Sequence, residues 1–134
     1  MAMQFSVAVR NARLDAFETT AGATAKLRIL TGTQPASCAT AQSGTLLCEM
    51  TLPSDWLAAA SSGSKAKAGT WSGTATAAGT AGYFRIVDNA GTTCHQQGSI
   101  TATSGGGDME LDNTSIAVSQ TVTVTSYSVT DGNA

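Results

Sequence analysis

The chain has 134 residues, the size of one domain, and a formal net charge of −2. Only 12% of the residues are charged, and the seven Lys and Arg residues form no dense basic patch, which argues against nucleic-acid binding. No stretch approaches the length of a membrane span, and no signal peptide is recognisable. We therefore expect neither nucleic acid nor a membrane as a partner, and synthesis in the cytosol.

The first unit, residues 1–22, is predicted to be an extended arm followed by a helix. Ser6 is a suitable N-cap, the helix covers residues 7–20, and Gly22 ends it. A helical wheel gives two apolar stripes on roughly opposite sides. One stripe contains Val7, Leu14 and Phe17, and the other contains Val9, Ala12 and Ala16. The domain itself covers only one stripe, so the second either binds another molecule or is tolerated on the surface.

Alternating patterns predict the next strands. Residues 26–30 and 45–52 alternate apolar and polar positions, and the Gly, Pro and Ser residues of 31–44 predict a loop between them. Pro53 ends the second strand. Residues 54–60 are compatible with a helical turn, and residues 65–78 with one or two strands around Trp71.

The central stretch, residues 81–102, is predicted to be a β-hairpin. Phe84 and Ile86 lie on one face of its first strand, and residues 88–91 form a type I turn that ends in a left-handed Gly91. Residues 104–107 are expected to form a flexible tip, followed by short strands at 108–111 and 114–118.

The last strand covers residues 121–130, before a polar tail at 131–134. Val122 and Val124 share one phase of this strand and Tyr127 has the other, which predicts a bulge near Thr125 or Ser126. About eight short strands therefore follow the helix. The predicted fold is mostly β, an antiparallel sandwich or jelly roll formed by residues 23–134. The predicted core residues are Leu46, Met50, Phe84, Ile86, Met109, Leu111, Val122 and Val124.

Residues with potential chemistry do not combine into a catalytic motif. The only His, His95, is next to Cys94 and would lie on the opposite face of a strand, which disfavours a nucleophilic pair. Gly105–Gly107 lack the Lys-Ser or Lys-Thr of a phosphate loop. We expect no enzyme activity and no cofactor.

Three further patterns leave alternatives open. Asp108, Glu110 and Asp112 share a strand face, which favours a solvated acidic edge over a Ca²⁺ site. Trp56 and Trp71 are expected to be core residues, although exposed Trp side chains could stack on a sugar. The three cysteines form no disulfide framework or zinc site, and pairing of Cys38 with Cys94 stays open.

The N-terminal unit is the predicted interaction surface. All Lys and Arg residues lie at or before Arg85. The rest of the chain contains five acidic residues and no basic one. A second copy could therefore present Asp108, Glu110, Asp112 or Asp131 to the basic N-terminal unit, which favours a dimer, with a trimer as the alternative. The candidate contact residues are Met3, Phe5, Val9, Arg10, Arg13 and Ala16.

An ordered set of motifs resembles a protein family. It comprises RNARLDAFET at 10–19, KLRILTG at 26–32, GTLL at 44–47, AGYFRIVDNAGT at 81–92, GGGDMELDNTSI at 105–116 and VTVTSYSVTDGNA at 122–134. The set is similar to small structural proteins encoded in the head-gene region of tailed bacteriophages, and the resemblance covers nearly the whole chain.

The resemblance implies a virion protein on the capsid exterior, a decoration or cement protein with a jelly-roll-like body. Its implied partner is the major capsid protein, and it implies no catalytic residues. The alternative is a tail or head-fibre module that binds a host surface glycan, for which Trp56 or Trp71 should be exposed.

Overall fold

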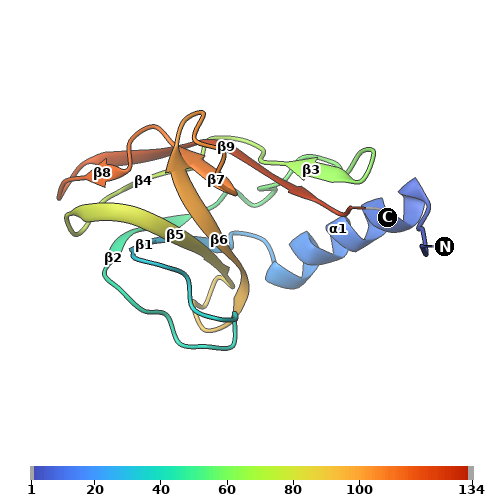
Figure 1. Ribbon diagram of the computed structural model, residues 1–134, viewed down its shortest axis with the longest axis horizontal. Helices are drawn as coiled ribbons and strands as arrows, with labels where there is room; N and C mark the ends of the chain where they lie inside the picture. Colours follow the sequence, from blue (N-terminus) through green and yellow to red (C-terminus); the bar gives the residue numbers. More distant parts are fainter. Residues whose placement is uncertain (1, 133–134) are drawn as a thin grey trace.

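The computed structural model describes residues 2–132, which form one helix and nine strands (Figure 1). The mostly β fold with an N-terminal helix is confirmed. Met1, Asn133 and Ala134, at the outer ends of the expected arm and tail, lie outside the described residues. The elements are α1 (Val7–Ala21), β1 (Lys26–Thr31), β2 (Leu46–Thr51), β3 (Ser64–Ala66), β4 (Ser72–Thr74), β5 (Gly79–Val87), β6 (Cys94–Ala102), β7 (Met109–Leu111), β8 (Ser115–Ile116) and β9 (Thr121–Thr130).

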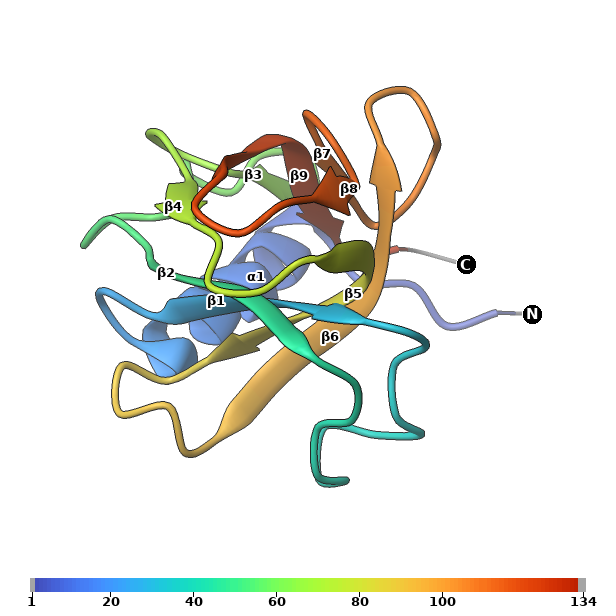
Figure 2. The ribbon, with the colours of Figure 1, turned by 90° about the vertical axis from the view of Figure 1, so that its left-hand side faces the viewer.

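The strands follow one hydrogen-bonded path in the order β2-β1-β5-β6-β7-β9-β3, with β4 paired to β9 and β8 paired to β5. The sheet curls, so that β1, β2 and β5 form one side of the body and β3, β4 and β9 the other (Figure 2). Neighbouring strands are antiparallel except β6 and β7, which are parallel. The sheet is therefore mixed rather than wholly antiparallel.

A tight return loop at residues 103–108 allows the parallel pair. The N–H of Gly105 donates to the carbonyl of Ala102 at 2.9 Å, and the N–H of Gly107 donates to Thr101 Oγ1 at 3.0 Å. A Cβ atom on Gly105 would lie 2.6 Å from the Cβ of Thr101. The segment expected to be a flexible tip is thus a loop packed against Thr101, and glycine permits that close approach.

Two bulges set which side chains enter the core. In β2, Ile29 pairs with Cys48 and Leu30 with Leu46, so Leu47 is the extra residue and is fully buried. The prediction that Leu46 is a core residue is therefore wrong, since the bulge shifts the phase and leaves Leu46 half-buried. The bulge expected near Thr125 is confirmed: Glu110 pairs with Ser126 and Leu111 with Val124.

The other predicted core residues are all buried: Met50, Phe84, Ile86, Met109, Leu111, Val122 and Val124. The core also contains a row of five aromatic rings that runs from α1 to β5. The rings, in order, are Phe17, Trp56, Trp71, Tyr127 and Phe84, with successive centroids 5.5, 5.9, 5.1 and 5.9 Å apart. Such spacings favour edge-to-face and tilted contacts between rings.

The segment before β3 is extended, so the helical turn expected at 54–60 is wrong. The N–H of Ala58 donates to Ala66 and the N–H of Ala68 donates to Trp56, each at 2.8 Å. Both Trp56 and Leu57 are buried. The burial of these two large side chains outweighs the helix preference of the three Ala residues that follow them.

The open edge of β2 is covered by the segment around β4. The N–H of Thr76 donates to the carbonyl of Leu47 at 2.8 Å. A Cβ atom on Gly73 would lie 2.8 Å from the Cβ of Met50, so glycine is required for this approach. The segment that follows β4 therefore protects part of the outer edge of β2, at the carbonyl of Leu47.

The hairpin between β5 and β6 is confirmed, and Asp88 organises its turn. The Asp88 carboxylate accepts from the N–H of Thr92 at 2.7 Å and from the N–H of Thr93 at 3.1 Å. Gly91 follows with φ of 76°, the left-handed conformation expected there. Hydrogen bonds from the backbone N–H groups of Thr93 and Thr92 lower the pKa of Asp88 to about 2.

This pKa shift predicts a loss of stability in acid. The folded pKa lies below the ordinary value of 3.8, so the ionised carboxylate stabilises the fold above that value, and the contribution disappears as the pH falls from about 5 to about 2. We expect urea unfolding of Asp88→Asn to show a smaller loss of unfolding free energy over this range than the wild-type protein. Asp55→Asn, at an exposed carboxylate, is the control and should keep the wild-type slope. Equal slopes for wild type and Asp88→Asn would contradict the assignment.

Candidate docking surface

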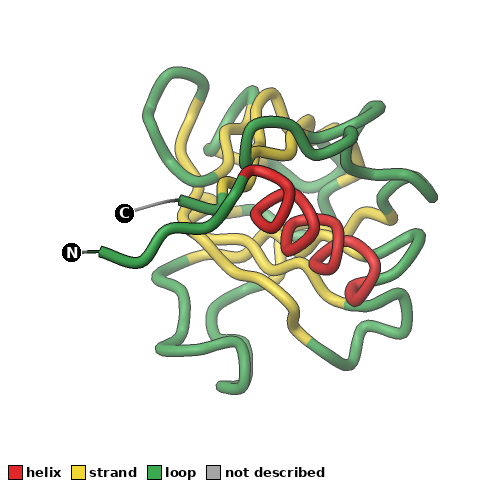
Figure 3. The backbone as a smooth tube through the Cα atoms, turned by 90° about the vertical axis from the view of Figure 1, so that its right-hand side faces the viewer, coloured by secondary structure: helices red, strands yellow, loops and turns green. Residues whose placement is uncertain are grey.

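Helix α1 has one face that packs on the body. Leu14 and Ala21 are buried, and the ring of Phe17 meets Trp56 edge-on at 5.5 Å. The Oγ atom of Ser6 accepts from the N–H of Val9 at 3.2 Å, and Gly22 follows the last turn with φ of 89°. The predicted cap and stop are therefore confirmed, and the helix covers one end of the curled sheet (Figure 3).

Polar contacts hold the start of the helix beside the end of β9 (Figure 1). Arg10 Nε donates to the carbonyl oxygen of Asp131 at 2.6 Å, and Arg13 Nε lies 3.1 Å from Asp131 Oδ2. Asn11 Oδ1 accepts from the N–H of Gly63 at 2.9 Å. These bonds fix α1 to two segments far from it in sequence.

A buried lysine ties the middle of the helix to β3. Lys65 is only 5% exposed, and its Nζ lies 2.6 Å from Asp15 Oδ1 and 2.8 Å from Glu18 Oε2. Burial alone would lower the pKa of Lys65, but hydrogen bonds and charge interactions with Asp15 and Glu18 outweigh burial, so the pKa is raised. Lys65 therefore stays charged, and the helix is an integral part of the body.

Apolar side chains gather on the arm and the first turn of α1. Met3 is 79% exposed, Phe5 42%, Val7 50% and Val9 43%. We call these four residues the arm patch. The guanidinium of Arg13 lies 4.9 Å from the centre of the Phe5 ring, a cation–π contact that holds the arm against the helix. In residues 2–132, the only other large apolar side chain as exposed is Val118, at 59%.

The predicted contact residues separate into two groups. Met3, Phe5, Val9 and Ala16 are exposed, and the outward stripe of α1 also includes the exposed Ala12. Arg10 and Arg13 instead bind Asp131 of the same chain, since the end of β9 returns to the helix. Asp131 of the same chain therefore already binds both arginines, and a contact of these arginines with a second copy stays a prediction.

Val7 belongs to the arm patch although it shares its helical stripe with Leu14 and Phe17, which pack on the body. It lies in the first turn, where α1 extends past β3 (Figure 1) and the body no longer covers the helix. The position of Val7 on the helical wheel does not show how far along the helix the body extends. The sequence signal for an exposed apolar surface is the pair of apolar residues that precede the helix, Met3 and Phe5.

Three acidic residues of the second half, Asp108, Glu110 and Asp112, each accept hydrogen bonds from a different segment of the same chain. Asp108 Oδ2 accepts from the N–H of Ser99 at 2.8 Å, Glu110 from the N–H groups of Ser104 and Gly106, and Asp112 from the N–H of Thr123. Among residues 2–132 no group of three or more His, Cys, Asp or Glu side chains could hold a metal ion. The three carboxylates thus bind backbone N–H groups of β6, of the 103–108 loop and of β9, respectively.

Both tryptophans are buried, Trp56 at 0% and Trp71 at 1% exposure. Their Nε1 atoms donate to the carbonyls of Gly22 at 3.1 Å and Ala68 at 3.0 Å. The expectation that they are core residues is confirmed, and neither ring can stack on a sugar from solvent.

Two of the cavities on the body formed by residues 2–132 could be considered as small-molecule sites. One, of about 230 Å³, lies under residues 38–42 and includes Arg28, Arg85 and Cys94 in its wall. The other, of about 390 Å³, lies beside Tyr83 and is lined by Gly32, Ser99 and Asp108 among others. Neither combines a nucleophile with a neighbouring His, since His95 lines neither of them.

Comparison of the chain with models of protein families, with curated proteins and with solved structures finds no match in any of the three. Within residues 2–132 the structure contains no helix of the length and apolar character needed to cross a membrane.

Proposed function

We propose that this chain is a decoration protein of a tailed-bacteriophage head, which binds the outer surface of the shell through the arm patch and bridges subunits of the major capsid protein. The observation that carries the proposal is the concentration of Met3, Phe5, Val7 and Val9 at one end of a body whose large apolar side chains are otherwise mostly buried. Contiguous exposed apolar groups mark protein interaction sites.

The attachment of the helix supports this role. Contacts of Arg10 and Arg13 with Asp131, and of Lys65 with Asp15 and Glu18, fix α1 to the sheet. Val7 and Val9 of the arm patch lie on this fixed helix, and the contact of Phe5 with Arg13 holds the arm against it. Side chains on a fixed element lose less conformational entropy on binding than those on a free tail. Many such contacts repeated over a symmetric shell add up through avidity.

Sequence resemblance supplies the identity of the partner, since the motifs at 10–19, 81–92 and 105–116 are similar to phage head-region proteins. A homo-oligomer, with a dimer favoured over a trimer, remains part of the proposal, and it rests on the apolar residues because the arginines bind within the chain. The glycan-binding alternative has no support from Trp56 and Trp71, which are buried.

The proposal predicts that apolar side chains of the arm dominate binding. We expect the variant Met3→Ser, Phe5→Ser, Val9→Ser to bind heads about a hundredfold more weakly, because about 3 kcal/mol of apolar burial is lost. Purified protein is incubated with heads assembled without it, and the bound fraction is measured by sedimentation. The wild-type protein should saturate at a copy number close to that of the shell subunit.

The control is Val118→Ser, which removes a similarly exposed apolar side chain (59% exposed) from the turn before β9, near β8 and at the opposite end of the molecule from the first turn of α1 (Figure 1). It should bind like wild type. Both variants should keep the wild-type circular dichroism spectrum. Full occupancy by the triple variant would refute the arm patch as the docking surface, and absence of wild-type protein from heads would refute the function.

A further inference from the structure

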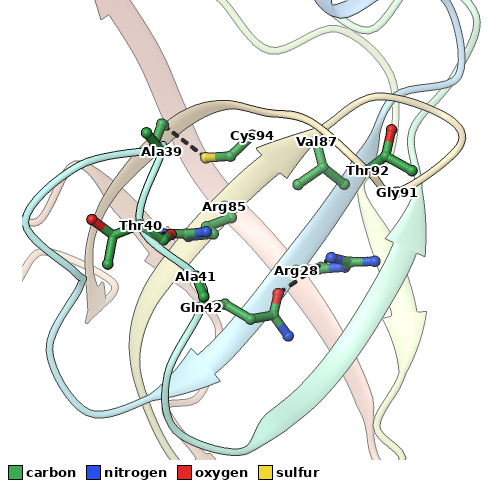
Figure 4. Close-up of a pocket in the computed structure, with 11 residues that line it drawn as sticks. Arg28, Ala39, Thr40, Ala41, Gln42, Arg85, Val87, Gly91, Thr92 and Cys94 are labelled. Atoms are coloured by element: carbon green, nitrogen blue, oxygen red, sulfur yellow. Dashed lines mark hydrogen bonds between the residues drawn. The ribbon is translucent and has the colours of Figure 1, made fainter.

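Two of the three cysteines meet between the long loop and the sheet. Cys94 is the first residue of β6, and Cys38 lies in the loop of residues 32–45 that joins β1 to β2. Their Sγ atoms are 2.7 Å apart although the residues are 56 positions apart in sequence. Figure 4 shows Cys94 directed at the loop that carries Ala39 and Thr40, with a dashed line from its sulfur atom to that loop.

Contacts that do not involve sulfur hold the loop in this position. Arg85 Nη2 donates to the carbonyl of Thr40 at 2.7 Å, and Gln97 Nε2 donates to the carbonyl of Pro35 at 2.6 Å. The hydroxyl of Tyr83 donates to the carbonyl of Ser43 at 2.6 Å. These polar contacts, made by loop residues on both sides of Cys38, hold the loop on the outer face of β5 and β6.

We propose that Cys38 and Cys94 form a disulfide bond that clamps the 32–45 loop to β6. The sulfur atoms need to approach by only about 0.7 Å to reach the length of an S–S bond. This inference is independent of the proposed function, since it rests on the loop and the sheet alone.

Thiol–disulfide exchange with a small disulfide such as oxidised glutathione supplies the chemistry. Burial and the hydrogen bond to Cys38 raise the pKa of Cys94 to about 12, so its thiol stays protonated and donates to the sulfur of Cys38. Cys38 gives its proton to solvent, and its sulfur then attacks the glutathione disulfide and releases one glutathione thiolate, which takes up a proton from solvent.

The sulfur of Cys94 then attacks the Cys38–glutathione bond and expels the second glutathione, while its proton passes to a glutathione thiolate. The protein loses two electrons and two protons, and oxidised glutathione gains them and becomes two thiols. Cys48 takes no part, because it is 0% exposed and lies in β2 on the core side.

The clamp is expected to stabilise the fold. It closes a long segment, from the loop before β2 to the start of β6, and so restricts the unfolded chain. We expect the midpoint of thermal unfolding to rise by about 10 °C on oxidation.

The test uses the full chain, incubated with oxidised or reduced glutathione. After oxidation, thiol labelling in denaturant should find one thiol, that of Cys48, where the reduced protein has three. Peptide mapping by mass spectrometry should recover a peptide that links Cys38 to Cys94. The unfolding midpoint of the oxidised protein should exceed that of the reduced protein.

Cys38→Ser and Cys94→Ser are the matched variants, and Cys48→Ser is the control. The first two should show no glutathione-dependent change in midpoint, and Cys48→Ser should show the wild-type change. Three free thiols after oxidation, or a stable glutathione adduct on Cys38, would overturn the bond. A linked peptide without a rise in the midpoint would overturn the clamp.

Discussion

Phe84→Ala is expected to lower the free energy of unfolding by about 3–5 kcal/mol, because it removes a large buried side chain and leaves a cavity. Phe84 is 1% exposed and forms the end of the aromatic row, edge-on to Tyr127 at 5.9 Å. It pairs across the hairpin with Gly98, where a Cβ atom would lie 2.8 Å from the Phe84 ring. The ring thus occupies the space above a residue without a side chain, and no neighbour fills it when the ring is lost.

Urea unfolding of the purified protein measures this loss. Phe84→Leu is the control, since it keeps most of the volume and should cost less than about 1.5 kcal/mol. Similar stabilities for Phe84→Ala and the wild-type protein would show that Phe84 does not fill the core.

Trp56→Ala is the second substitution with a large expected effect, also about 3–5 kcal/mol. Trp56 is fully buried and lies between Phe17 of α1 and Trp71 of the body. Its Nε1 donates to the carbonyl of Gly22 at 3.1 Å, at the end of the helix. The ring therefore joins the helix to the sheet both by packing and by a hydrogen bond.

Loss of this connection should appear first in the helix. We expect faster hydrogen exchange at the amides of α1 in Trp56→Ala, beyond the change at β5 and β6, in addition to the lower urea midpoint. Trp56→Phe keeps an aromatic ring between Phe17 and Trp71 and loses the hydrogen bond and part of the ring volume, so its α1 amides should stay closer to wild type than those of Trp56→Ala. If α1 is as protected in Trp56→Ala as in the wild-type protein, the helix is held by its polar contacts alone.

Elements with local signals were predictable from the sequence. Ser6 and Gly22 bracket a helix because capping is a property of neighbouring backbone groups. Asp88 and Gly91 define the hairpin turn for the same reason. The change of phase between Val124 and Tyr127 located the bulge in β9, since a strand with one buried face must keep its apolar residues on that face.

Features that depend on distant partners were not predictable. Leu47 replaces Leu46 in the core through a bulge opposite Leu30, and only the pairing with β1 specifies it. Trp56 lies in an extended segment, and its ring joins rings from four other segments of the chain. In the candidate site, the sequence predicts Met3, Phe5 and Val9 as contact residues because they are apolar and lie in the arm or on the second stripe of the helix. The contact of Arg10 with Asp131 could not be predicted, because the two residues are 121 positions apart in the sequence.

Strand β9 pairs with β3, β4 and β7, and β3 and β4 have no other strand partner in the sheet. During synthesis, these strands therefore leave the ribosome well before residues 121–130 can pair with them. The nascent chain must hold two unpaired strand edges and part of the aromatic row in an incomplete state, a condition that favours aggregation and engagement by chaperones. Folding of the second half of the sheet is thus completed only when β9 has been synthesised.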